Sequence, residues 1–92
     1  MTIKWNLEIN GMNKNVFDEG EAEWCIAEID RVSAEDCYVD NVRFARKSDP
    51  ESVKRYNHAK DYYGCCGFAD WEETRTVDGI STVYLLGYNF GH

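Results

Sequence analysis

Two adjacent cysteines and a histidine at the end of the sequence are the residues best suited to chemistry. Cys65 and Cys66 stand between glycines in Gly64-Cys65-Cys66-Gly67, and the last residues are Asn89-Phe90-Gly91-His92. Thiolates and imidazoles are the ligands that zinc prefers, and a thiol beside an imidazole can also act as a nucleophile and its base. Because these groups are remote in the sequence, either chemistry requires an element that brings them together.

A β-hairpin is the element that the sequence predicts. Asp78-Gly79 is typical of a two-residue type I′ turn, since both residues tolerate the positive φ angles that this turn requires. Pairing Val77 with Ile80 then fixes the register of the whole hairpin. The pairs further out are Thr74 with Val83, Trp71 with Leu86, and Phe68 with Asn89. The same count sets Cys65 opposite His92 and Cys66 opposite Gly91.

These residues predict a candidate zinc site made of Cys65, Cys66, His92 and His58, the last from the helix before the hairpin. The spacing is not a Cys-x-x-Cys motif, and adjacent residues of a regular strand point to opposite faces. A metal-free corner flanked by glycines therefore stays open as the alternative. A catalytic Cys65–His92 dyad would also need an orienting group and an oxyanion site, and no motif in the sequence supplies them. We predict that the protein is not an enzyme.

The segments before the hairpin predict the rest of a small fold. A strand at 3–9, in which apolar and polar residues alternate, is joined to a shorter strand at 12–17 by a tight turn at Asn10-Gly11. Asp18 and Glu21 form a capping box that begins a helix. Its buried stripe is Ala22, Cys25, Ile26, Ile29 and Val32, in which Cys25 is a small core residue and not a ligand.

A further strand and helix follow. The strand covers 37–46, and the helix begins with Asp49 as N-cap and Pro50 in its first position. The whole chain, residues 1–92, is thus predicted to be a single α+β domain of order β-β-α-β-α-β-β. We expect both helices on one face of a mostly antiparallel sheet. In the hairpin, the face with Tyr84 and Leu86 is the expected core, and the other is expected to meet solvent or a partner.

Composition limits the class of protein. The chain has 92 residues, of which 43% are hydrophobic, and this suits one globular core. No apolar run reaches the ~18 residues that a membrane span needs, so we expect no membrane contact. The first residues lack the apolar stretch of a signal peptide, which predicts a cytoplasmic protein whose four cysteines are free or metal-bound.

Acidic residues are concentrated in the first part of the chain. The net charge is −7, and residues 1–40 carry ten acids and three bases, whereas residues 41–92 are balanced. Such a surface repels phosphate, so we expect no direct contact with nucleic acid and instead a partner protein with a basic surface. A solvated helix face with no partner is the simpler alternative. The candidate contacts are Asp18, Glu19, Glu21, Glu23, Glu28 and Asp30.

Aromatic side chains are more numerous in the last 37 residues than one small core can bury. Tyr62 and Tyr63 are neighbours on a helix and cannot both face inward. Tyrosine and tryptophan are common at interfaces, because they contribute contact area at little entropic cost. Tyr62, Tyr63 and Trp71 are therefore candidate anchors for a partner. Separately, the basic residues clustered between Arg43 and Lys60, together with the acidic first part of the chain, make the protein a dipole that is compatible with a head-to-face homodimer.

The closing pattern resembles a group of small tailed-bacteriophage proteins. These proteins have a Cys-Cys-Gly corner and end in Gly-x-Asn-aromatic-Gly-His, as in Cys65-Cys66-Gly67 and Gly87-Tyr88-Asn89-Phe90-Gly91-His92 here. The resemblance covers about residues 64–92 and brings no known activity. It implies a viral protein of the counter-defence or host-takeover class, which acts by binding a host machine such as a CRISPR effector, a nuclease, RNA polymerase or a toxin.

The sequence thus favours a small acidic interaction protein that inhibits or redirects a host protein. One alternative is a zinc-stabilised structural domain, with Cys65, Cys66, His92 and His58 as ligands. Another is an oligomeric protein associated with the virion.

Overall fold

The computed structural model of the chain describes residues 17–63 and 67–90. Within this range lie α2 (Glu19–Val32), β1 (Asp40–Arg46), α3 (Pro50–Tyr63), β2 (Phe68–Val77) and β3 (Ile80–Asn89). This order matches the last five elements of the predicted series and confirms the α+β class. The two strands predicted before α2 fall outside the described residues, apart from Phe17.

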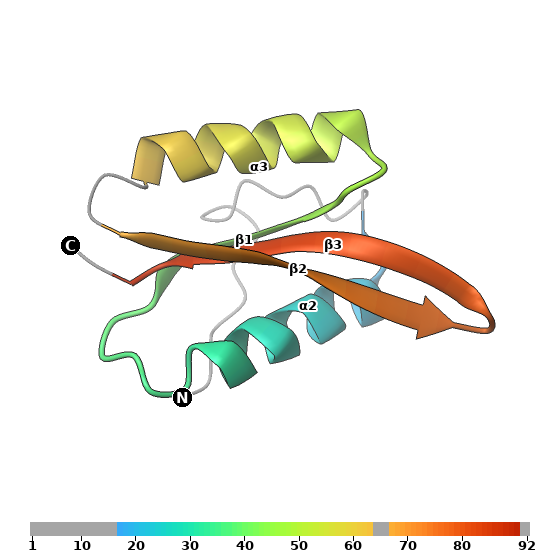
Figure 1. Cartoon of the computed structure of the whole chain (residues 1–92), viewed down its shortest axis with the longest axis horizontal. Coiled ribbons are helices and arrows are strands. Elements are labelled where there is room, and N and C mark those ends of the chain that lie inside the picture. Colours follow the sequence, from blue (N-terminus) through green and yellow to red (C-terminus); the bar gives the residue numbers. More distant parts are fainter. Residues whose placement is uncertain (1–16, 64–66, 91–92) are drawn as a thin grey trace.

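The three strands form one antiparallel sheet in the order β1-β3-β2, with β3 in the middle. α3 covers one face of this sheet and α2 covers the other (Figure 1). Our prediction that both helices share a face is wrong, because both faces of β3 take part in packing. Tyr84 packs against Trp24 of α2, whereas Gly87, on the opposite face, lies close to Tyr56 of α3.

The start of α2 follows the predicted capping box. The Asp18 carboxylate accepts a hydrogen bond from the Glu21 amide at 2.7 Å, and the Glu21 carboxylate accepts one from the Asp18 amide at 3.2 Å. In the predicted stripe, Cys25 and Ile29 are fully buried, which confirms Cys25 as a core residue. Val32 is exposed, however, because the helix ends there and Ser33 takes the buried position.

α3 also begins as predicted. The Asp49 carboxylate accepts hydrogen bonds from the amides of Glu51 and Ser52, and Pro50 is the first helical residue. Further along the helix, Tyr56 is 2% exposed and donates a hydrogen bond from its hydroxyl to the carbonyl oxygen of Leu86 at 3.0 Å. This contact fixes α3 over the middle strand of the sheet.

The β2–β3 hairpin confirms both the predicted turn and the predicted register. Asp78 and Gly79 have φ angles of 51° and 78°, as a type I′ turn requires. The observed pairs include Val77 with Ile80, Thr74 with Val83, Trp71 with Leu86, and Phe68 with Asn89. The next pair is held by a hydrogen bond from the Phe90 amide to the Gly67 carbonyl. The predicted pairing of Cys65 with His92 lies outside the described residues.

The main core lies between the sheet and α2. Its fully buried members are Cys25, Ile29, Phe44 and Leu86, and Tyr84 is 1% exposed. This is the hairpin face that we predicted to be the core. On the opposite face α3 covers Gly87, while four side chains of β2 are exposed. These are Asp70, Glu72, Thr74 and Thr76.

Candidate functional site

The residues proposed as zinc ligands are placed only in part. Cys65, Cys66 and His92 lie outside the described residues, and His58 is exposed on α3. Among residues 17–63 and 67–90, no three histidine, cysteine or acidic side chains come together as a metal site would require. The two cysteines in this range differ, because Cys25 is buried and Cys37 is exposed. Burial raises the pKa of the Cys25 thiol, which keeps it protonated.

The acidic residues of α2 and its N-cap do not form one continuous surface. Glu23 and Asp18 are exposed, whereas Asp30 is half-buried. Glu28 forms an ion pair with Arg31 at 2.7 Å, and the side chain of Glu19 is not described. Glu21 departs most from the expectation, because it is buried inside the molecule and its carboxylate is used within the fold.

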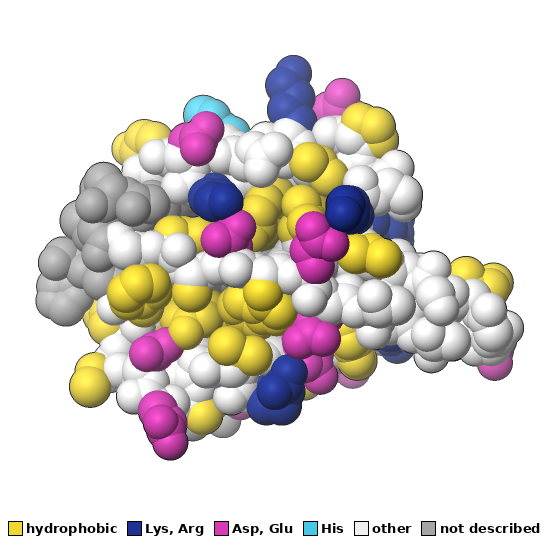
Figure 2. All heavy atoms as spheres, in the orientation of Figure 1, with side chains coloured by type: hydrophobic (Ala, Val, Ile, Leu, Met, Phe, Trp, Pro, Cys, Tyr) yellow, Lys and Arg dark blue, Asp and Glu magenta, His cyan; other side chains and the backbone are white. Residues whose placement is uncertain are grey.

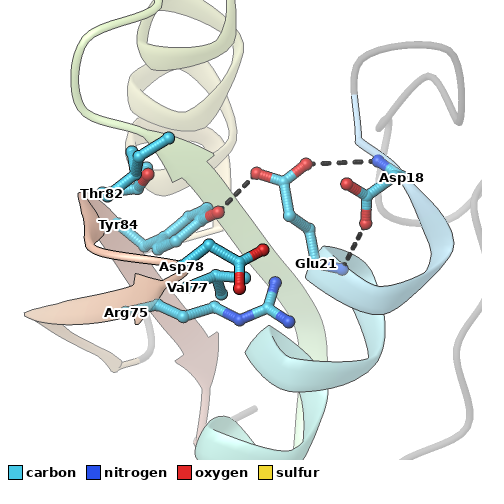
Figure 3. Close-up of a pocket in the computed structure, with 8 residues that line it drawn as sticks. Asp18, Glu21, Arg75, Val77, Asp78, Thr82 and Tyr84 are labelled. Atoms are coloured by element: carbon cyan, nitrogen blue, oxygen red, sulfur yellow. Dashed lines mark hydrogen bonds between the residues drawn. The ribbon is translucent and has the colours of Figure 1, made fainter.

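Glu21 is the centre of a network that joins three elements. Arg46 of β1 donates two hydrogen bonds to its carboxylate, one of them from Nε to Oε1 at 2.7 Å. The Tyr84 hydroxyl of β3 donates a third, and the Asp18 amide donates a fourth (Figure 3). Phe17 completes the packing, with the Arg46 guanidinium 5.0 Å from its ring centroid. The network therefore ties the start of α2 to the sheet.

The network also shifts the ionisation of its members. Burial alone would raise the pKa of the Glu21 carboxyl, but hydrogen bonds from Arg46, Tyr84 and the Asp18 amide outweigh it and lower the pKa from 4.5 to about 2. Burial, together with the hydrogen bond to Glu21, raises the pKa of Tyr84 to about 12. At neutral pH the Glu21 carboxylate therefore stays ionised and the Tyr84 phenol stays neutral, which suits a structural role.

The free energy of unfolding at acidic pH should depend on the ionisation of the Glu21 carboxylate. Because the pKa of Glu21 is depressed in the folded state, its contribution is complete above about pH 4.5 and is lost as the pH falls toward 2. A shift of this size corresponds to roughly 3 kcal/mol. We expect the Glu21→Gln variant to be less stable than the wild type at pH 7. As the pH falls from 4.5 to 2, the variant should lose less free energy of unfolding than the wild type. Urea unfolding followed by tryptophan fluorescence at several pH values measures the difference.

Beside this network lies a cleft between the first turn of α2 and the far end of the hairpin, with a volume of about 290 Å³. Its lining residues are Asp18, Glu21, Arg75, Val77, Asp78, Ile80, Thr82 and Tyr84. Figure 3 shows Arg75 extending from the hairpin toward α2. Its guanidinium lies over the Trp24 ring, 5.8 Å from the centroid, and forms no ion pair with the rest of the described chain. The cleft combines charges of both signs with apolar walls, which suits a side chain of another protein.

The hairpin tip, Val77-Asp78-Gly79-Ile80, extends past both helices (Figure 1). Ile80 is 71% exposed and Val77 is 47% exposed. Figure 2 shows hydrophobic side chains at the end of this projection. The sequence predicts the turn, but its flanking residues are not among the predicted contacts. The sequence signal for such a contact is a pair of aliphatic residues that directly flank a polar turn.

The aromatic residues proposed as anchors have different surroundings. Tyr62 is 70% exposed at the end of α3. Trp71 is half-buried and packs edge to face against Tyr88, with ring centroids 6.0 Å apart, so it borders the core. The side chain of Tyr63 is not described. Of the two whose side chains are described, Tyr62 has the accessibility that an anchor requires.

Comparison with known proteins does not extend this description. No family model matches the chain, and no curated protein and no solved structure matches it. The phage resemblance of the closing segment therefore stays a prediction. In the part of the chain that the structure describes, no helix is both long enough and apolar enough to cross a bilayer.

Proposed function

We propose that this chain is a non-enzymatic interaction protein that binds a host protein and inhibits or redirects it. The exposed hairpin tip carries this proposal, because Ile80 and Val77 present apolar surface at the end of a projecting element. The ten-residue strands on either side are paired along their whole length. A projection held in this way loses little conformational entropy when it binds, so more of its contact energy appears as affinity.

The acidic residues around the tip favour a partner in which basic residues surround the apolar contact, here called its basic rim. Asp78 lies in the tip, Asp18 lies across the cleft, and both are exposed, as is Glu23 further along α2. Acidic side chains around an apolar contact speed association with a basic surface and select against acidic ones. Glu21 is not part of this contact surface, since its carboxylate is buried and paired with Arg46.

The class of partner rests on the resemblance of residues 64–92 to small phage proteins. On that basis we place the protein in the host cytoplasm as a counter-defence or host-takeover factor. The targets that fit this class are a CRISPR effector, a nuclease, RNA polymerase or a toxin. Tyr62 is a candidate second contact, because it is 70% exposed.

Capture from host lysate with the tagged full chain tests the proposal. We expect Ile80→Glu to reduce the recovery of the specific partner at least about tenfold, because a carboxylate in an apolar contact lacks a hydrogen-bond partner. The yield of each host protein is measured by quantitative mass spectrometry. Recovery should also fall as salt is raised and in Glu23→Lys, since both weaken the attraction to a basic rim.

Val32→Glu is the matched control. Val32 is also an exposed aliphatic residue, at 41%, but it lies at the end of α2 and outside the tip and the cleft. It should leave the recovery of the partner unchanged. Equal recovery with Ile80→Glu and the wild type would contradict the proposal, as would a loss of equal size with Val32→Glu.

A further inference from the structure

β2 is the edge of the described sheet, and its outer side carries backbone groups that can pair with another strand. In a two-residue hairpin, the residues next to the turn exchange hydrogen bonds across the ladder. The backbone N–H and C=O groups of Val77 therefore point toward β3, and the same holds for Arg75, Glu73 and Trp71. The alternate residues direct theirs to the outer side, where no strand among residues 17–63 and 67–90 pairs with them. Those residues include Asp70, Glu72, Thr74 and Thr76.

The two helices leave this edge open. α2 and α3 make most of their contacts with β1 and β3, so β2 extends beside the helices and, toward the tip, beyond them (Figure 1). The outward-facing residues from Asp70 to Thr76 are also exposed at their side chains. Among residues 17–63 and 67–90, β2 is paired on one side only, and a ten-residue strand of this kind is a template for strand addition.

We infer that two copies of this chain associate through antiparallel pairing of their β2 edges, centred on Thr74. This register sets Glu73 of each copy opposite Arg75 of the other, which gives two ion pairs related by the twofold axis. It also sets the half-buried Trp71 opposite Val77, which is 47% exposed. The two sheets become one continuous antiparallel sheet.

Neighbouring registers lack this complementarity. Centring the pairing on Glu72, on Glu73 or on Arg75 places that charged residue opposite itself in the other copy. Centring it on Thr76 shortens the paired segment and sets Arg75 opposite Val77. Like charges that face each other destabilise a strand pair, so the charges on β2 select one register and a second copy of the same chain.

Glu73 and Arg75 are each half-buried in the single chain, so part of each side chain is left for a new partner. Arg75 forms no ion pair within the described residues. Glu73 accepts one hydrogen bond from Arg31 of α2 at 3.2 Å, which leaves its second carboxylate oxygen for Arg75 of the other copy. Arg31 would then lie beside the new pair and add a second positive charge to Glu73.

Sedimentation of the purified, untagged protein tests the inference. The wild type, with a chain mass of 10.7 kDa, should change from monomer to dimer as its concentration rises from micromolar to hundreds of micromolar. Glu73→Arg and Arg75→Glu should each weaken self-association at least about tenfold, because each sets like charges opposite one another. An equimolar mixture of the two variants should form a heterodimer, since opposite charges again face each other. Circular dichroism confirms that each variant is folded.

Disulfide formation tests the register independently. Facing residues in a hydrogen-bonded antiparallel pair have Cα atoms about 5.5 Å apart, which a disulfide can span. Under mild oxidation the Thr74→Cys variant should form a disulfide between the two copies through the new thiols at position 74, identified by peptide mapping. In Thr76→Cys the new thiols lie four residues from the facing position, about 13 Å away along the strand, and should not join.

Three outcomes would overturn the inference. They are a wild type that remains monomeric at all concentrations, a mixture of the charge variants that remains monomeric while the wild type dimerises, and a disulfide that forms as readily in Thr76→Cys as in Thr74→Cys. These measurements use purified protein and no host component. Their failure would therefore leave the proposed binding of a host protein unaffected.

Discussion

Replacing Glu21 with alanine is expected to destabilise the fold by about 3 kcal/mol. The substitution leaves the Arg46 guanidinium partly buried without its carboxylate, and it removes the acceptor of the Tyr84 hydroxyl. It also removes half of the capping box, because the Asp18 amide loses its hydrogen bond. Urea unfolding at pH 7 measures the loss of free energy.

Glu28→Ala is the matched comparison for this prediction. Glu28 also forms an ion pair from α2, but its partner Arg31 is largely exposed, so solvent screens the pair and its loss should cost much less. Replacing Glu21 and Arg46 together with methionine should recover much of the loss, since no charge is then left unpaired. A Glu21→Ala variant no less stable than Glu28→Ala would contradict the role assigned to the network.

Replacing Gly87 with alanine is expected to cost about 2–4 kcal/mol. A Cβ atom at this position would lie 2.4 Å from Cε1 of Phe68 and 2.7 Å from the Tyr56 hydroxyl. Both rings are in contact across this site, with centroids 6.4 Å apart, so they cannot move away independently. Displacing Tyr56 also breaks its hydrogen bond to the Leu86 carbonyl. Thermal and urea unfolding measure the effect.

Gly20→Ala provides the control, because its Cβ would lie 3.5 Å from the nearest atom, an ordinary contact. In a helix this change should be neutral or stabilising by up to about 1 kcal/mol. Adding Phe68→Leu to Gly87→Ala should restore part of the lost stability by removing the nearest ring atoms. A Gly87→Ala variant as stable as the wild type would contradict the close packing of Tyr56 and Phe68 over Gly87.

Local signals explain which parts of the fold could be predicted from the sequence. The capping box at Asp18 and Glu21 depends on residues three positions apart, and the type I′ turn depends on Asp78 and Gly79 alone. Once that turn was assigned, the register of the hairpin followed by counting. The closing pairs around Cys65 and His92 extend the same count beyond the described residues.

The parts that could not be predicted depend on contacts between distant segments. The burial of Glu21 requires Arg46 from one strand and Tyr84 from another. The helical pattern alone does not contain these partners, so it predicts Glu21 as a partner contact like the exposed Glu23. The placement of the helices on opposite faces depends on Gly87, whose missing side chain admits Tyr56 to the second face. A glycine in a strand does not by itself predict that a helix covers that face, because the sequence does not show which distant side chain packs over it.

Site-specific photo-crosslinking in host lysate tests the proposed binding role of the hairpin tip most directly. A photoreactive phenylalanine derivative is placed at position 80 in one sample of the full chain and at position 32 in another. Both positions are exposed, so the two proteins should fold alike. We predict a discrete covalent adduct with one host protein from position 80 and none from position 32. An adduct from position 32 alone, or none from position 80 while the wild type still captures a partner, would contradict binding through the tip.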